Sequence, residues 1–155
     1  MRGKQAVKKP LKPDGVYNSE LVSKLINYMM LDGKKQTART IVYNAISDLE
    51  KKTKTKGIEA LEKAVENVKP KIEVRSRRVG GSNFQVPVPV SAGRQLYLAL
   101  KWIIEAARGG RKNTEMWEVL SRELLNAYNK EGSAIKKKEE VHKKADANKA
   151  FAQFA

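Results

Sequence analysis

The chain of 155 residues contains no cysteine and a single histidine, His142. The absence of thiols excludes disulfide scaffolds, thiol nucleophiles and cysteine-ligated zinc or iron–sulfur sites. A single imidazole also excludes metal sites that need two histidines. His142 lies in a polar, lysine-rich segment, where we expect a surface side chain rather than a catalytic base. The sequence therefore predicts no metal, no cofactor and no enzymatic activity.

Long apolar runs are also missing. No stretch approaches the roughly 18–20 residues that a membrane-spanning helix needs. Residues 1–15 begin with basic side chains, but no apolar segment follows, so they do not resemble a secretory signal. Hydrophobic residues nevertheless make up 41% of the chain, which is enough for one packed core at this length. We expect a soluble, intracellular, single-domain protein without membrane attachment.

Positive charge is what the chain has in excess. Lysine and arginine number 32 against 17 acidic residues, which gives a formal net charge of +15. The basic residues are clustered, whereas acids concentrate on segments with ordinary amphipathic helical spacing. Such a field favours a polyanionic partner, with nucleic acid first and an anionic membrane second. The membrane alternative needs a basic helix with a strong apolar face, which the lysine-rich last segment lacks.

Apolar spacing divides the chain into an arm and one helical domain. Residues 1–17 contain prolines and no helical period, so we expect an extended basic arm that orders only against a partner. Residues 18–155 form the domain, and Ser19 is the expected N-cap of its first helix. Apolar residues at 3/4 spacing predict a mainly α bundle of six helices, at about 19–31, 35–52, 58–69, 91–108, 114–129 and 134–151.

Between the third and fourth helices the apolar period changes from 3.6 to two. Residues 72–90 read as two β-like runs around a Gly-Gly-Ser-Asn turn. Pro87 and Pro89 alternate with valines, so their nitrogens must point away from the partner strand. The sequence predicts a protruding two-stranded ribbon. Because an isolated hairpin is marginal in water, we expect its outer half to be mobile unless a partner holds it.

Several basic side chains are candidates for nucleic-acid contact, because a guanidinium binds phosphate bidentately and a lysine at a helix start favours anions. By the period of two, Arg75 and Arg77 share one ribbon face and Arg78 lies on the other. The set is Arg2, Lys4, Lys8, Lys9, Lys12, Lys34, Lys35, Arg75, Arg77, Arg78, Arg94, Arg108, Arg111, Lys136, Lys137, Lys138 and Lys143. The ribbon tip adds Val79, Gly80, Gly81, Ser82, Asn83 and Phe84. Phe84 either stacks on a base or packs on the bundle, and His142 either contacts RNA or faces solvent.

Four blocks of sequence carry a resemblance to a known family. They are LDGKK (31–35), ENVKPKIEVRSRRVGGSNFQVPVPV (66–90), LALKW (98–102) and GSAIKKKEEVHKKADANKAFA (132–152). In this order they resemble small-subunit ribosomal protein seven of the bacterial and organellar type. The resemblance implies a helical bundle with a protruding ribbon. It also implies primary binding to the 3′ major domain of the small-subunit rRNA, which becomes the head of the subunit.

The resemblance implies partners as well. In that family the ribbon lies near the exit-site tRNA and the mRNA exit channel, and ribosomal proteins nine and eleven of the small subunit are neighbours. Some members also repress translation of their own mRNA. The expected location is the ribosome, in the cytoplasm or in an organelle. The chain departs from the family at Pro13-Asp14-Gly15, at Ala92-Gly93-Arg94-Gln95 and at its end, Gln153-Phe154-Ala155.

Two other functions stay open from the residues alone. A helical DNA-binding regulator would use the ribbon as a minor-groove arm, and would need a dimer or a base-reading recognition helix. A general basic nucleic-acid-binding protein would need only the charge. The last helix offers mainly lysine, which reads phosphate rather than bases. We therefore expect a structural rRNA-binding protein that is monomeric when free.

Overall fold

The computed structural model describes residues 3 and 10–154, with the side chain of residue 154 excepted, and these form a mainly helical chain with one small sheet. This confirms the predicted fold class, with the ribbon placed between the third and fourth helices. The elements in chain order are α1 (Glu20–Met29), α2 (Lys35–Thr53), α3 (Gly57–Val68), β1 (Ile72–Val79), β2 (Ser82–Pro89), α4 (Ala92–Gly109), α5 (Met116–Tyr128), α6 (Ser133–Ala147) and the 3-10 helix η1 (Lys149–Phe154).

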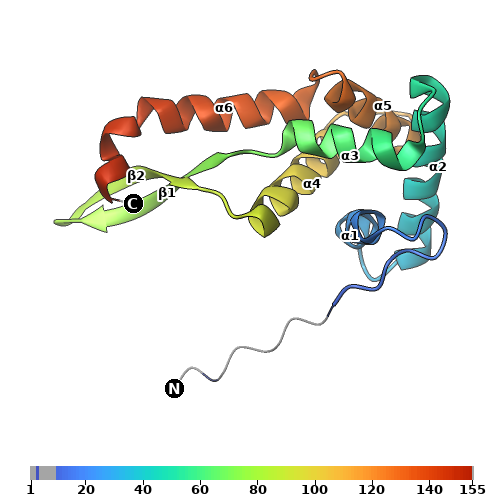
Figure 1. The fold of residues 1–155 in the computed structure, drawn as a ribbon, viewed down its shortest axis with the longest axis horizontal. Coiled ribbons are helices and arrows are strands. Elements are labelled where there is room, and N and C mark those ends of the chain that lie inside the picture. The colour runs from blue at the N-terminus through green and yellow to red at the C-terminus, as the bar shows by residue number, and fades with distance from the viewer. Residues whose placement is uncertain (1–2, 4–9, 155) are drawn as a thin grey trace.

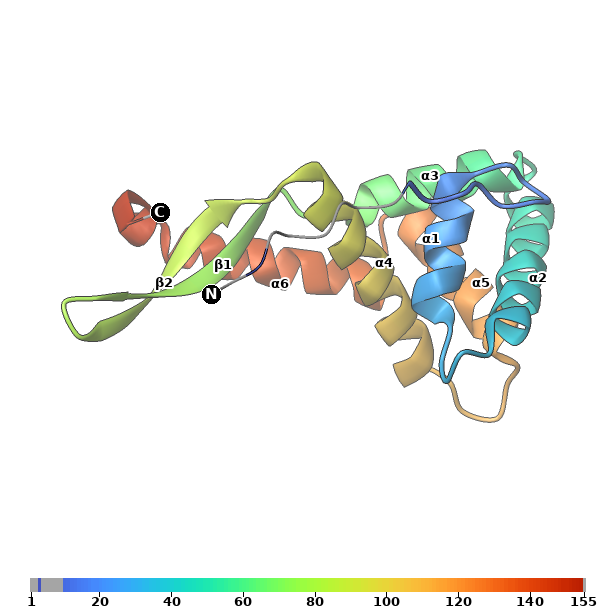
Figure 2. The same cartoon turned by 90° about the horizontal axis from the view of Figure 1, so that it is seen from below.

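The core of the bundle is built around α5, which packs against α2, α3 and α4 (Figures 1 and 2). Its apolar stripe follows the 3/4 spacing of the sequence, so Leu120 and Leu124 are fully buried. Leu49 of α2, Leu61 of α3 and Ile103 of α4 are fully buried in the same cluster. Each such side chain contributes about 1.5–3 kcal/mol through burial, which makes this cluster the rigid base of the molecule.

The ribbon and α6 extend together from one side of this bundle. Figure 1 shows them running side by side, and the tip of the ribbon reaches beyond the C-terminal end of α6. α6 contacts β1, and η1 turns back against β2. The ribbon is therefore supported by the chain's own C-terminal segment, which supplies the contacts that a lone hairpin lacks.

The strands pair antiparallel, with Val79 opposite Ser82. The connecting turn is only Gly80-Gly81, and both residues have positive φ, at 57° and 88°. Glycine adopts this region without strain, which suits a two-residue hairpin turn. The predicted four-residue turn was therefore too long: Ser82 and Asn83 already belong to β2.

Pro87 and Pro89 of β2 have no backbone N–H group, and both lie at positions where pairing with β1 needs no donor. The amide of Val90 donates to the Lys71 carbonyl at 3.1 Å. Along an antiparallel strand, backbone nitrogens point alternately to the partner strand and away from it. Because the nitrogen of Val90 points to the partner side, those of Pro89 and Pro87 point to the outer edge. The sheet contains only β1 and β2. The prediction that the prolines face away from the partner strand is consistent with this register, and they block extension of the sheet at that edge.

Two helix ends differ from their predictions. Ser19 occupies the N-cap position of α1, but its side chain makes no capping hydrogen bond. Instead its carbonyl accepts the amide of Asp14 at 3.2 Å, so the preceding segment folds back onto the helix start. The last α-helix ends at Ala147 rather than at residue 151, and the chain continues as η1. Of the described helices, none is long and apolar enough to span a membrane.

The start of α6 is held by a carboxylate from another helix. Glu123 of α5 is nearly buried, and its Oε1 accepts the amide of Ala134 at 2.9 Å. Gly132 has a φ of 93°, and a Cβ added to it would lie only 2.9 Å from the Cβ of Asn126. The chain therefore needs a glycine at this close approach. A negative group at a helix N-terminus satisfies an orphan amide and the helix dipole. This contact positions α6, and with it the ribbon.

Candidate nucleic-acid interface

Three predicted basic residues from separate segments line one hollow. Lys34 comes from the α1–α2 turn, Arg108 from the last turn of α4, and Arg111 from the loop after it. The hollow has a volume of about 430 Å³, and its apolar floor includes Met29 and Met116. We call it the basic hollow. The convergence of three cations over an apolar floor suits a nucleotide, which carries phosphate and an apolar base face.

Backbone carbonyls fix the two guanidinium groups of the basic hollow. Nη2 of Arg108 donates to the carbonyl of Met29 at 3.1 Å, and Nε of Arg111 donates to that of Thr114 at 3.3 Å. A guanidinium has five N–H donors, so each group keeps donors for a ligand. Asp32 also lines the hollow and is its single acidic lining residue. The remaining charge is positive.

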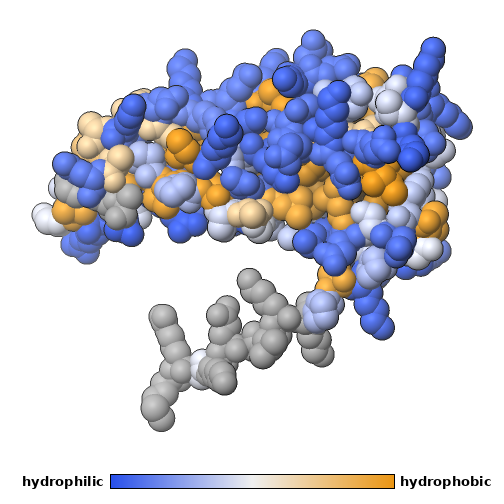
Figure 3. All heavy atoms as spheres, in the orientation of Figure 1, coloured by the Kyte–Doolittle hydropathy of each residue, from blue (hydrophilic) through white to orange (hydrophobic). Residues whose placement is uncertain are grey.

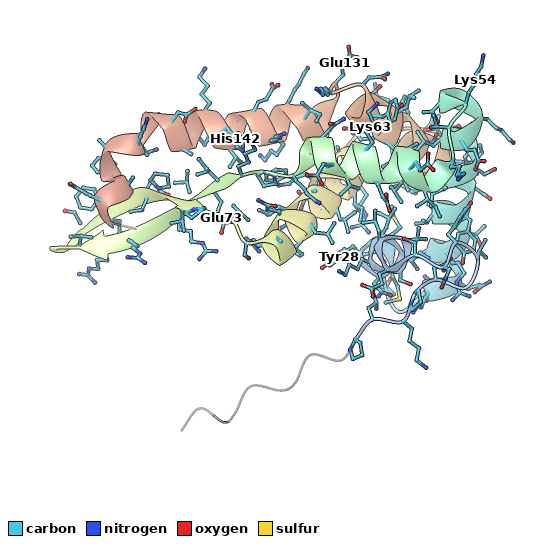
Figure 4. All side chains as sticks on the ribbon, viewed as in Figure 1. Tyr28, Lys54, Lys63, Glu73, Glu131 and His142 are labelled. Carbon is cyan, nitrogen blue, oxygen red and sulfur yellow. The ribbon has the colours of Figure 1, made fainter. Side chains whose placement is uncertain are left out.

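The three arginines of β1, together with Arg94 at the start of α4, fall into two groups. Glu73 of β1 is nearly buried, and its carboxylate binds both Arg75 and Arg94, the latter with Nε at 3.3 Å from Oε2. Figure 4 shows Glu73 on the side of the ribbon turned away from α6. Arg75 and Arg94 therefore already have an anionic partner within the protein. Arg77 and Arg78 are exposed nearer the tip, on opposite faces of β1.

At the ribbon tip, Val79 to Asn83 are exposed. Phe84 is only half-buried, because its ring lies 5.2 Å from that of Phe151 in η1, at an interplanar angle of 49°. The sequence left two roles open for Phe84, base stacking or packing. In this structure the ring packs, but against the C-terminal segment rather than against the bundle.

The lysines of α6 do not share one role. Lys136 and Lys143 are exposed, and Lys137 is exposed beside Glu140 at 3.7 Å. Lys138 turns inward instead, where its Nζ donates to the Asn67 carbonyl at 2.6 Å. Burial, together with the nearby charge of Lys71, lowers the pKa of Lys138. Lys138 thus joins α6 to the end of α3, which is a structural contact that its place in a lysine run does not indicate.

His142 makes a contact within the protein that neither of its two expected roles includes. Its side chain is half-buried, and Nε2 accepts the amide of Lys71 at 3.1 Å. Figure 4 shows the side chain on the face of α6 that meets the ribbon. The imidazole therefore links α6 to the residue before β1. The local sequence pattern does not reveal this contact, because the partner is a backbone amide 71 positions away.

The arm residues are described in part. Arg2, Lys4, Lys8 and Lys9 lie outside the described residues. Lys12 is exposed, and its carbonyl accepts the hydroxyl of Ser23 at 2.9 Å. Lys12 and Lys35 line a second hollow of about 370 Å³, together with Arg39. Sequence reasoning missed Arg39, although its spacing of four from Lys35 puts both on one face of a helix.

Hydrophilic side chains dominate the face shown in Figure 3, where hydrophobic groups form scattered patches, the largest of them towards the middle. Within residues 3 and 10–154, no group of three or more histidine or acidic side chains is placed to hold a metal ion. Among the described residues, the predicted basic side chains lie at the two hollows, on the ribbon and the adjoining start of α4, and along α6.

Comparison with known proteins assigns these features to a family. The model of the family "Ribosomal protein S7p/S5e" matches residues 1–149. The chain belongs to the ribosomal protein S7p/S5e family. Within the S7p/S5e match lie both hollows, the ribbon and α6, whereas Phe151 lies beyond it. Membership also confirms the resemblance that the four sequence blocks carry, and it implies a structural role.

Individual S7 relatives match over almost the whole chain. A protein described as small ribosomal subunit protein uS7 from Thermosipho melanesiensis is 54% identical over 154 residues, which is 99% of each chain. Proteins with the same description from Nautilia profundicola and Sulfurovum are 53% and 51% identical, again over 99% of each chain. At this coverage the similarity extends over almost all of the elements described above.

Proposed function

We propose that this protein is a structural, non-catalytic component of the small ribosomal subunit that binds the 3′ major domain of the small-subunit rRNA and organises the subunit head. The observation that carries the proposal is the family match over nearly the entire chain. The basic hollow supports it, because three basic side chains converge there beside apolar residues, and RNA is bound through phosphate contacts and base stacking.

The fold suggests how the binding is achieved. The bundle is rigid, and it places Lys34, Arg108 and Arg111 at one end while α6 presents further lysines along its exposed side. RNA recognition of this kind relies on shape and on phosphate contacts. A fixed spatial pattern of cations then distinguishes one folded RNA junction from polyanions of the same charge density.

We place the ribbon tip, residues 79–84, beside exit-site tRNA and the mRNA exit channel. Its exposure, its projection beyond η1 and the arginines just behind it support that position (Figure 1). Ribosomal proteins nine and eleven of the small subunit are the proposed protein neighbours. Repression of the protein's own mRNA follows if that mRNA presents an rRNA-like junction to the same cations. Bacterial relatives favour a ribosome in the bacterial cytoplasm.

Competition binding tests the proposal. Labelled 3′ major domain rRNA is bound by the full-length protein at about 0.15 M salt, where exposed charges are screened within about 8 Å. Excess bulk tRNA and duplex DNA serve as competitors. We expect the rRNA complex to survive both and to give a footprint at a multi-helix junction. Equal competition by all three polyanions would show that binding is electrostatic only.

Gel filtration of the free protein separates this proposal from a DNA-binding regulator. We expect a monomer, because a surface that matches an RNA junction needs no two-fold symmetry. A palindromic operator is read by a symmetric dimer. A stable dimer with duplex DNA preferred over rRNA would replace the ribosomal proposal with the regulator.

A further inference from the structure

The segment before α1 is fixed to the bundle through Asp14. This carboxyl group is 6% exposed, and Oδ2 accepts the amides of Val16 at 3.0 Å and Tyr17 at 3.2 Å. Oδ1 accepts the hydroxyl of Tyr43 of α2 at 2.7 Å. Burial opposes ionisation, but these hydrogen bonds and the charge of Arg39 outweigh it and lower the pKa of Asp14. Asp14 is therefore an anion with both oxygens already bonded.

A hollow lies where this segment crosses α1 and α2. Its volume is about 370 Å³, and its charged lining residues are Lys12, Lys35, Arg39 and the carboxylate of Asp14. Ser23 and Asn27 add neutral polar groups, and the three cations outnumber the one anion. The volume is more than ten times the roughly 30 Å³ that a water molecule occupies in the liquid. We call it the arm hollow. It is distinct from the basic hollow, since the two share no lining residue.

Arg39 is incompletely satisfied in the arm hollow. Its Nε is buried, and among the described residues it is the only buried side-chain nitrogen or oxygen without a hydrogen-bond partner. The neighbouring Nη1 has one long contact, 3.4 Å, to Oε1 of Gln36. Asp14 is close enough to feel the charge of Arg39, yet its oxygens are occupied by other donors. A buried charged donor left unpaired is costly, and an anion bound to the Arg39 guanidinium would offset part of that cost.

We propose that the arm hollow binds one phosphate of the RNA backbone, with Arg39 as the principal ligand and Lys35 and Lys12 beside it. The inference rests on the proposed rRNA-binding function and specifies one of its contacts. The fork of a guanidinium matches two phosphate oxygens. Asp14 holds the segment that carries Lys12, so the site is complete only when that segment is seated on α1 and α2.

The experiment compares full-length wild-type protein with Arg39→Gln, Arg39→Lys and the control Lys54→Gln. Lys54 is exposed at the opposite end of α2 (Figure 4), about 22 Å along the helix from Arg39. The probe is 3′ major domain rRNA, in intact form and with randomly ethylated phosphates. Thermal unfolding of each variant shows whether its fold is retained.

We expect Arg39→Gln to weaken rRNA binding about 10- to 100-fold. The slope of log affinity against log salt should fall by about 0.7–0.9, the value for one phosphate contact. Ethylation of one particular phosphate should block rRNA binding by the wild type but should have no effect on binding by Arg39→Gln. Arg39→Lys should keep the salt slope but lose affinity, and Lys54→Gln should match the wild type. Unchanged affinity, slope and ethylation pattern in folded Arg39→Gln would overturn the site.

A second probe keeps this test independent of the rRNA assignment. Inorganic phosphate that binds only the folded protein raises its unfolding temperature. At matched ionic strength we expect phosphate to stabilise wild type more than chloride does, and Arg39→Gln to show a smaller difference, because the general stabilisation by phosphate remains. An equal response of the two proteins contradicts the anion site. Failure of wild type to prefer rRNA over tRNA contradicts the proposed function instead.

Discussion

His142 shows how one side chain joins two elements. Its Nε2 accepts the Lys71 amide, which only a neutral imidazole can do. Burial first, and then the positive charges of Lys138 and Lys71, lower the pKa of His142 below 6.5, although Asp146 opposes them. The folded protein therefore disfavours the protonated form of the residue that links α6 to β1.

This shift predicts a pH dependence of stability. The pKa is lower in the folded state than the ordinary 6.5 of the unfolded chain, so the unfolded state binds the proton more readily. The stabilisation is complete above about pH 6.5 and is lost as the pH falls through the folded value. We expect the free energy of unfolding, measured by urea titration, to fall between about pH 7 and pH 5.

His142→Gln is the matched variant, because an amide oxygen accepts a hydrogen bond but does not titrate. Since the chain has only one histidine, this variant should lose most of the decline in that pH range. His142→Ala should be less stable even above pH 7, because it leaves the Lys71 amide without its acceptor. A decline in His142→Gln as steep as in wild type would assign the titration to another group.

At the scale of elements, the ribbon depends on the C-terminal segment. α6 lies along β1, η1 contacts β2, and Phe151 meets Phe84. An aromatic pair of this geometry contributes about 0.5–1.5 kcal/mol beyond the area it buries. The same contact leaves the ring of Phe84 half-buried rather than fully exposed.

Phe151→Ala should loosen the ribbon while leaving the bundle intact. We expect amide hydrogen exchange in β2 to accelerate roughly 2- to 10-fold, which corresponds to the energy of the lost ring contact. Exchange in α2 should not change and serves as the internal reference. Gln153→Ala alters an exposed side chain of the same segment and is the control. Identical exchange in the two variants would mean that the ring contact does not hold the ribbon.

At the scale of the whole molecule, the arrangement of charge matters more than its amount. The net charge of +15 attracts any polyanion. The bundle adds a pattern, because it brings the turn before α2 next to the end of α4 in the basic hollow. Specific binding should therefore respond to where a charge is removed, whereas non-specific binding responds to how many are removed.

Two double variants separate these effects. Arg108→Gln/Arg111→Gln removes two charges from the basic hollow, and Lys51→Gln/Lys54→Gln removes two exposed charges at the end of α2. In salt titrations with 3′ major domain rRNA, we expect only the first to reduce the slope, by about 1.4–1.8 for two phosphates at 0.7–0.9 each. Both should weaken bulk tRNA binding alike. Equal loss of rRNA affinity in the two variants would contradict a specific role for the hollow.

The predicted helices and ribbon largely agree with the structure, because apolar period and glycine or proline breaks act over a few residues. The two differences occur where the chain just outside a helix folds back on itself. The Ser19 side chain makes no capping hydrogen bond, and the carbonyl of Ser19 accepts the amide of Asp14 in the folded-back segment. The last α-helix stopped at Ala147, where the chain turns so that η1 meets β2.

The sequence indicated which basic residues belong to the candidate site. It did not indicate which of them lie together or which are bound by other groups of the protein. Lys34, Arg108 and Arg111 were named from local turns and helix ends, and the structure brings them together. Arg75, Arg94 and Lys138 were named in the same way, yet each is engaged within the protein. Whether these residues contact RNA remains a prediction.

The sequence alone determined the fold class, the strong positive charge and the family. Apolar spacing indicates the fold class, composition gives the charge, and contiguous blocks of residues indicate the family. Only the tertiary structure decided which charges converge and which are neutralised. Three examples depend on contacts between segments that are remote in the chain. They are the hollow shared by Arg39 and Lys12, the ion pair of Arg94 with Glu73, and the hydrogen bond from the Lys71 amide to His142. Such contacts form because packing of the core fixes the helices in space, and no local pattern records that geometry.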